Sequence, residues 1–142
     1  MGVALVWLAS FSVVSNGQEL PSSALKTGGS WNGDSWLHAD ASMRIAYING
    51  MLDGVRDACL YNQLRTHAPD AEYRKCLQYF WVANVSVFDL MDQVAHLYSN
   101  PANRAIPLDQ IYVIAVGIMQ GTPEEKTNAN LEYFRRVFTQ SK

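Results

Sequence analysis

The stretch from Trp36 to Cys59, WLHADASMRIAYINGMLDGVRDAC, is the one that we expect to decide the fold. Asp40 is a good N-cap residue, and apolar side chains recur every three or four positions after it to about Gln63, which predicts a helix. A glycine inside a helix costs roughly 0.5–1 kcal/mol relative to alanine. The helix nevertheless carries small residues at every fourth position, which predicts that a second backbone approaches this stripe closely: Gly50, Gly54 and Ala58.

The same stretch ends at one of two cysteines, and the other is Cys76. An even number of cysteines in a short exported chain favours a disulfide, whereas a cytosolic pair would more often stay as free thiols. A zinc site is a poor alternative because no further Cys or His stands at a suitable spacing. Closing a loop of about 15 residues stabilises a fold by roughly 3 kcal/mol in the chain-entropy model. We therefore predict a Cys59–Cys76 disulfide.

Four further helices are expected downstream. Asp70 is expected to cap the first of them, and the consecutive aromatic residues 79–81 indicate that this helix is buried on two sides. The third is apolar nearly all round, so we place it at the centre of the fold. The sequence thus predicts an all-α, compact four- to five-helix domain with one disulfide, whose later helices span about 70–81, 86–99, 107–119 and 122–139.

The domain organisation has three parts. Residues 1–17 are predicted to be a signal peptide, because the apolar block 3–14 is followed by small residues at a suitable cleavage position. No Lys or Arg precedes the block, which leaves a buried N-terminal segment as the alternative. Residues 18–35 are expected to be a flexible lead-in that Trp31 helps to pin to the body, and residues 36–142 a single helical domain.

Composition excludes several classes of protein. The 142 residues are 49% hydrophobic and 17% charged, an ordinary globular balance. The net charge of −2 provides no basic face for nucleic acid. The sequence contains no apolar run long enough for a transmembrane segment. The predicted signal peptide and disulfide indicate a periplasmic or secreted protein. We expect it to have no cofactor and to bind another protein, with a homodimer as an open alternative.

Three clusters could support chemistry. Asp89, Asp92 and His96 share one helix face at a spacing that metal sites use, although a solvated acidic face is the more ordinary interpretation. His38 lies between Asp34 and Asp40, and His67 lies close to Asp70, as a base and its orienting carboxylate would. Neither pair has an evident nucleophile, and no phosphate-binding, zinc-protease or dinucleotide motif occurs. We expect these histidines to have no catalytic role.

The order of these parts resembles the Rap1a/Tai family of bacterial immunity proteins. The features that carry the resemblance are a helix with Arg44, Tyr47-Ile48, Gly50 and Gly54 that leads to a cysteine, a second cysteine, and the run Asn100-Pro101-Ala102-Asn103-Arg104 between two helices. The resemblance covers roughly residues 36–117. It implies a small exported helical protein that protects a cell by binding a secreted amidase, and it carries no functional residues over.

We therefore predict a non-catalytic protein that acts by protein–protein binding, as an inhibitor or immunity protein does. The loops 62–70 and 100–106 are the expected contact regions, because loops on a rigid scaffold often carry recognition. The candidate contact residues within them are His67, Asp70, Asn103 and Arg104. One alternative is a periplasmic stress chaperone. The other is a metal-dependent enzyme that uses the Asp89, Asp92 and His96 cluster.

Overall fold

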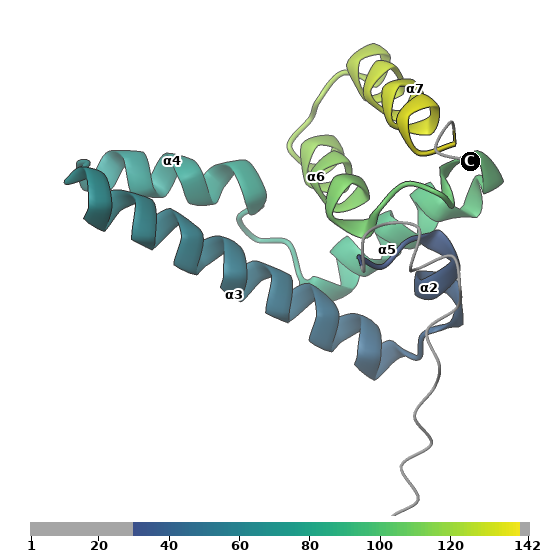
Figure 1. Cartoon of the computed structure of the whole chain (residues 1–142), viewed down its shortest axis with the longest axis horizontal. Helices are drawn as coiled ribbons and strands as arrows, with labels where there is room; N and C mark the ends of the chain where they lie inside the picture. Colours follow the sequence, from purple (N-terminus) through teal and green to yellow (C-terminus); the bar gives the residue numbers. More distant parts are fainter. Residues whose placement is uncertain (1–29, 140–142) are drawn as a thin grey trace, which may run out of the picture.

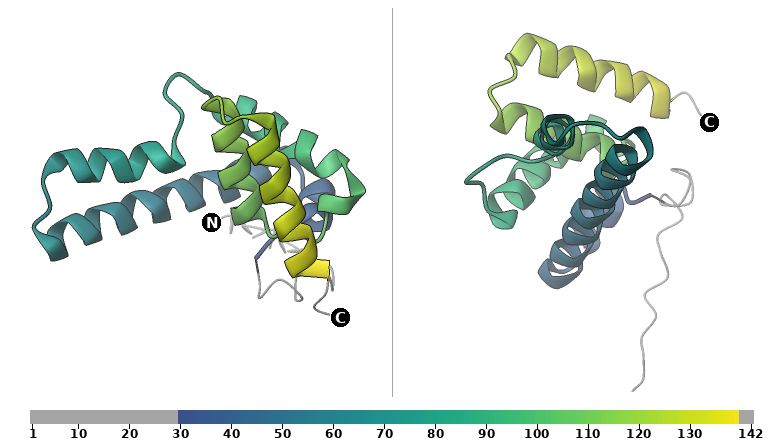
Figure 2. Two further views of the ribbon diagram at one scale, coloured as in Figure 1. Left: turned by 90° about the horizontal axis from the view of Figure 1, so that it is seen from above. Right: turned by 90° about the vertical axis from the view of Figure 1, so that its left-hand side faces the viewer.

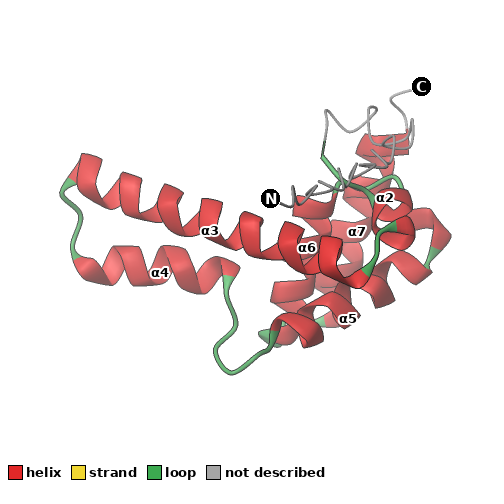
Figure 3. Cartoon of the chain, turned by 90° about the horizontal axis from the view of Figure 1, so that it is seen from below, coloured by secondary structure: helices red, strands yellow, loops and turns green. Residues whose placement is uncertain are grey.

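The computed structural model describes residues 30–139 and shows an all-α protein (Figure 3). The predicted signal peptide and most of the predicted lead-in lie outside the described residues. None of the described helices has both the length and the apolar character that crossing a membrane requires. In chain order the helices are α2 (Gly33–His38), α3 (Ala41–Thr66), α4 (Asp70–Phe80), α5 (Val87–Ser99), the 3-10 helix η1 (Pro101–Asn103), α6 (Leu108–Met119) and α7 (Glu124–Thr139).

Helix α6 lies at the centre of the body, as its apolar sequence predicts. It packs against α5 on one side and α7 on another (Figures 1 and 2). Tyr112 is buried in this helix, and its hydroxyl reaches outward to donate a hydrogen bond to the carbonyl oxygen of Phe80, 2.6 Å away. The other side chains of α6 in the core are Leu108, Ile111, Ile114, Ala115 and Val116.

Local signals place most helix ends correctly. Asp40 accepts a hydrogen bond from the Met43 N–H, so α3 begins where the N-cap predicts. Ser86 and Asp89 form a capping box at the start of α5. Gly121 has a positive φ of 84°, which suits its position after α6. Helix α7 begins at Glu124. The predicted helix over residues 107–119 is confirmed as α6.

The segment before Trp36 is folded from residue 30 onward. The prediction of a flexible lead-in is therefore wrong for residues 30–35, its last six. Asn32 caps the short helix α2, which the sequence reasoning missed. The Gly33 N–H donates to the carbonyl oxygen of Arg104 at 3.0 Å. Trp36 is fully buried, and Trp31 stacks on Tyr47 with ring centroids 4.7 Å apart. These two tryptophans therefore do anchor the segment to the body.

The face of α3 that packs inward is not the one that the small-residue stripe predicts. Gly50 and Gly54 are exposed, and an added Cβ at either position would meet no atom within 4 Å. The inward face follows a different set of positions, with spacings of three and four residues: Ile45, Ile48, Leu52, Val55 and Cys59. The expectation that the other helices pack around the stripe is wrong, because the chain is organised around α6.

Gly33 provides a test of the N-terminal docking. A Cβ at this position would lie 2.6 Å from Cδ1 of Tyr98 and 2.7 Å from Cα of Arg104, so neither the ring nor the backbone can easily make room. We expect Gly33→Ala to lower the free energy of unfolding by about 1–3 kcal/mol, the usual cost of overpacking. Chemical denaturation measures this change.

Gly54→Ala is the matched control. The site is open and helical, so the same substitution there should raise the stability by about 0.5–1 kcal/mol. Equal effects of the two substitutions would contradict the close approach at Gly33.

Candidate functional site

The feature that stands apart from the body is a helical arm, which we define as residues 53–81. It consists of the C-terminal half of α3, the turn after it, α4 and Trp81 (Figures 1 and 2). The two helices run side by side and project away from α5, α6 and α7. Cys59 is the one buried residue between 53 and 79, and no residue of this range belongs to the hydrophobic core of the body or packs against it. The arm is therefore an addition to the folded body.

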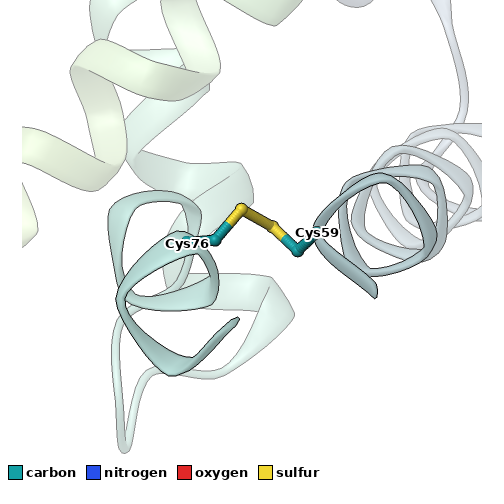
Figure 4. Close-up of a disulfide and its surroundings, with 2 residues drawn as sticks. All are labelled: Cys59 and Cys76. Carbon is teal, nitrogen blue, oxygen red and sulfur yellow. A yellow bond between two sulfur atoms is a disulfide. The ribbon is translucent and has the colours of Figure 1, made fainter. Parts of the chain in front are cut away.

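A disulfide joins the two helices of the arm, as predicted (Figure 4). The Cα atoms of Cys59 and Cys76 are 5.8 Å apart, within the usual range for a disulfide. Cys59 is buried, whereas Cys76 is half-buried. Because cysteine faces the partner helix in both cases, the residues three, four or seven positions away share that inward face.

The turn at the tip of the arm is short and regular. His67 ends α3 in a left-handed conformation with φ of 51°. The amide of Gln63 donates to the Asp70 carboxylate at 2.8 Å, which links α3 to the first turn of α4. Asp70 is the first residue of α4 rather than its cap, because Pro69 occupies the cap position without a side-chain hydrogen bond. The expected capping role of Asp70 is therefore wrong.

At its other end α4 is held by hydrogen bonds from Tyr112 of α6 and from Gln120, the residue after this helix. Besides the bond from Tyr112 to the Phe80 carbonyl oxygen, the Gln120 amide donates to the carbonyl oxygens of Gln78 at 2.6 Å and Trp81 at 3.0 Å. Partial burial raises the pKa of Tyr112 to about 12, so its hydroxyl stays protonated as a donor at neutral pH. The base of the arm is thus fixed to the body by hydrogen bonds from two side chains.

A groove of about 560 Å³ lies between α3 and α4 near this base. Its volume falls in the range of about 300–1,000 Å³ that ligand sites commonly have. The apolar part of the lining comes from Leu52 and Val55 on α3, from Leu77 and Phe80 at the end of α4, and from Trp81 and Ala83 just after it. The polar part comes from Asn49, Asp53, Arg56 and Gln78. A smaller hollow that shares Leu52 and Trp81 continues toward α5.

Large apolar side chains also lie exposed along the arm. Trp81 is 49% exposed although it lines the groove, and Tyr79 beside it is also exposed. Tyr61 and Leu64, near the tip, are 67% and 64% exposed. Helix α4 contains no buried residue, so the expectation that it is buried on two sides is wrong. Aromatic side chains of this kind are enriched in protein–protein interfaces.

The charges of the arm cancel. Its four acidic side chains are Asp53, Asp57, Asp70 and Glu72, and its four basic ones are Arg56, Arg65, Arg74 and Lys75. At the groove, Arg56 pairs with Asp53 at 2.9 Å within α3, and both side chains are exposed. The site therefore presents apolar surface with a rim whose charges are already paired. It favours an uncharged ligand surface over an acidic or basic one.

The four predicted contact residues do not form one surface. His67 and Asp70 lie exposed at the tip of the arm, whereas residues 100–106 lie at the opposite end of the molecule (Figure 1). Asn103 is only 2% exposed, and its amide donates to the carbonyl oxygen of Leu97 at 2.6 Å while its Oδ1 accepts from Arg135 at 2.8 Å. Asn103 therefore has a structural role, and the prediction that it contacts a partner is wrong. Arg104 is exposed.

The two histidine–carboxylate pairs are not formed. Nδ1 of His38 lies 2.7 Å from the backbone carbonyl oxygen of Asp34 rather than from its carboxylate. Asp40 instead accepts from Ser42 and from the N–H of Met43. The Asp70 carboxylate accepts from Gln63, and no hydrogen bond joins it to His67 among the described residues. Neither arrangement orients an imidazole as a general base.

The metal alternative has no support in residues 30–139. No group of three His, Cys, Asp or Glu side chains there is arranged to hold a metal ion. Asp89 belongs to the capping box of α5, where its carboxylate accepts from the Ser86 hydroxyl at 2.6 Å and from the Ser86 N–H at 2.9 Å. Asp92 and His96 are exposed on the same helix. The cluster is a solvated helix face.

Sequence reasoning missed the groove, although one signal could have located it. Leu52 and Val55 precede Cys59 by seven and four positions, and Leu77 and Phe80 follow Cys76 by one and four. Once the disulfide is assumed, the spacings of four and seven place Leu52, Val55 and Phe80 on the facing sides of the two helices, whereas Leu77, next to Cys76, lies about 100° around α4 at the edge of that face. The stripe of Gly50, Gly54 and Ala58 predicted packing on a different face of α3.

Comparisons of the chain with protein-family models, with curated proteins and with solved structures found no match.

The capping carboxylates give a pH-dependent prediction. The hydrogen bonds from the Ser86 hydroxyl and N–H hold the pKa of Asp89 below its usual value. A lowered folded-state pKa adds stability above the unfolded value of about 3.9, and this contribution disappears as the pH falls through the folded-state pKa. We expect Asp89→Ala to lower the melting temperature by a few degrees at pH 7, with a difference that narrows below about pH 4.

Asp92→Ala serves as the control, because Asp92 is exposed on the same helix and makes no capping hydrogen bond. Thermal melts between pH 2 and 7 compare the three proteins. A difference for Asp89→Ala that stays constant over this range would contradict the capping role of its carboxylate.

Proposed function

We propose that this protein is an exported, non-catalytic binding protein that holds a partner protein in the groove between α3 and α4. The observation that carries the proposal is the apolar groove on an arm that contributes nothing between residues 53 and 79 to the hydrophobic core. Monomeric proteins seldom leave large apolar surfaces exposed without a binding role. The disulfide supports export to an oxidising compartment.

The proposed partner presents an uncharged apolar helix face. The groove walls are two helices, and their inward side chains stand at spacings of three, four and seven residues, as in helix–helix seams. A third helix with apolar residues at matching intervals would complete this seam, as in other helix-in-groove complexes. The cancelled charges of the arm disfavour strongly charged partners and anionic membrane surfaces.

Inhibition of a toxic or lytic enzyme is the specific form of binding that we propose, following the resemblance to the Rap1a/Tai immunity proteins. Two structural observations are compatible with this role. The groove has a rigid frame, because the disulfide closes one end and hydrogen bonds from Tyr112 and Gln120 fix the other. A preorganised surface of this kind loses less entropy on binding and so supports tight inhibition.

Trp81 is the residue with which to test the groove. It lines the groove and is half exposed, and its backbone carbonyl accepts the Gln120 hydrogen bond, which an alanine retains. A partner is first identified by cross-linking and mass spectrometry in the native envelope fraction. We then expect Trp81→Ala to raise its Kd by about 30-fold, the effect of losing a hot-spot aromatic worth roughly 2 kcal/mol.

Phe88→Ala is the matched control, because Phe88 is an aromatic side chain on the body with 60% exposure and lines none of the hollows described above. Its Kd should stay within about twofold of the parent value. Equal loss of affinity in both variants, or no loss in Trp81→Ala, would contradict binding through the groove.

A stress-chaperone role is the second candidate, and the helix caps favour it. Asp40 at the start of α3 and Asp89 at the start of α5 both have pKa values lowered by capping hydrogen bonds, from Ser42 and Met43 in the first case and from Ser86 in the second. Below about pH 4 these caps are weakened by protonation. Helix starts on both sides of the arm would then loosen and expose apolar surface.

This role predicts that the fluorescence of a hydrophobic dye bound to the protein rises as the pH falls from about 4 to 2. The rise should be smaller in a protein carrying both Asp40→Asn and Asp89→Asn, because neither position then titrates. Fluorescence that stays flat down to about pH 2 would exclude the chaperone role.

A further inference from the structure

We infer that the Cys59–Cys76 disulfide is a redox latch for the groove: its reduction releases α4 from α3 while the body stays folded. The proposal concerns the regulation of the site described above. Its consequence for binding rests on the proposed function, whereas the release of α4 does not. Once the disulfide is removed, α4 is held only by burial, by noncovalent contacts with α3 and by its bonds to the body.

Burial alone does not hold α4. None of its residues is buried, and only Phe80, its last residue, packs against the hydrophobic core. With 11 residues, α4 is shorter than the roughly 12–15 that an isolated helix needs to be even marginally stable in water. Its helical state therefore depends on neighbours.

The two helices pack along each other, but this packing leaves Leu77 and Phe80 of α4 only half-buried, and few polar side-chain contacts add to the disulfide. The salt bridges in the described chain, Asp53–Arg56 and Glu72–Lys75, lie within single helices and do not cross from α3 to α4. The side-chain hydrogen bond that does cross is the one from Gln63 to Asp70 at the tip, and it is exposed. The bonds from Tyr112 and Gln120 hold only the last residues of α4 and Trp81.

The arm supplies no fully buried residue to the core of the body, against which only Phe80 of the arm packs. The core of the body consists of residues from α2, the N-terminal half of α3, α5, α6 and α7, together with Ile106. Ile48 is the last residue of α3 to be buried in this core. The structure thus separates into a body with its own core and an arm whose closure is covalent, which is the arrangement expected of a local unfolding unit.

The chemical step is thiol–disulfide exchange with a dithiol. A thiolate of the reductant attacks Sγ of the half-buried Cys76, Cys59 leaves as a thiolate, and the mixed disulfide is resolved by the second thiol of the reductant. The reductant is oxidised to its own disulfide. Two electrons and two protons are thereby transferred to the protein, and both cysteines end as thiols.

Hydrogen exchange measured by mass spectrometry on the full chain tests the latch, with dithiothreitol as the dithiol. After reduction, the amides of residues 53–79 should exchange about tenfold or more faster. Those of residues 90–116 should keep their protection. A double variant, Cys59→Ala with Cys76→Ala, should show the same fast exchange in the arm without dithiothreitol and no further response to it.

Two outcomes would overturn the inference. Unchanged exchange in the arm after verified reduction would mean that noncovalent contacts hold α4, and loss of protection in both regions together would mean that the disulfide supports the whole fold. If the arm opens as expected but the reduced protein binds its partner with unchanged affinity, the latch stands and the proposed binding site is wrong. Hydrogen exchange thus tests the latch, and partner affinity after reduction tests the proposed binding site, so failure of one can be told from failure of the other.

Discussion

Burial of α6 on nearly every side is the constraint on which the rest of the fold depends. A helix with Leu, Ile, Val and Ala around most of its circumference cannot leave any wide face in water without losing about 25 cal/mol per Å² of apolar surface. Helices α5 and α7 cover it, and the Tyr98 hydroxyl, whose pKa burial raises, donates to the carbonyl oxygen of Ile106 just before α6 begins. The N-terminal segment contacts the start of α6, where the Leu108 N–H donates to the carbonyl oxygen of Trp31.

Helix α3 is longer than this body requires, and its excess length creates the arm. At 1.5 Å per residue, its 26 residues extend about 39 Å. The half that ends near Leu52 packs on the body, while the other half continues into water with α4 beside it (Figure 1). Two helices cannot bury all their apolar side chains against each other, and the unburied remainder forms the groove and the exposed aromatic side chains.

Much of the fold could be predicted because helix ends are encoded locally. Asp40, the Ser86–Asp89 capping box and Gly121 act through backbone groups within a few residues, so the sequence around each one contains the necessary information. The orientation of α3 depends on distant partners and could not be read in the same way. Its apolar and small residues surround the helix on several faces, and the Gly50–Gly54 stripe suggested the wrong one.

The predicted contact residue Asn103 was wrong for the same reason. Its side chain accepts a hydrogen bond from Arg135 on α7, 32 residues further along the chain, and the sequence around Asn103 contains no information on where α7 lies.

The division into body and arm also explains why a binding surface can be located on the arm. Residues that stabilise a core are constrained by packing, and changing them costs about 2–5 kcal/mol when a large side chain is truncated. Residues 53–79 are free of that constraint because none of them packs in the core, so their side chains can suit a partner without weakening the body. The remaining requirement is that the arm keep a defined shape. The covalent bond between Cys59 and Cys76 keeps the shape of the arm defined where burial does not. The disulfide therefore both stabilises the arm and preorganises the proposed binding surface.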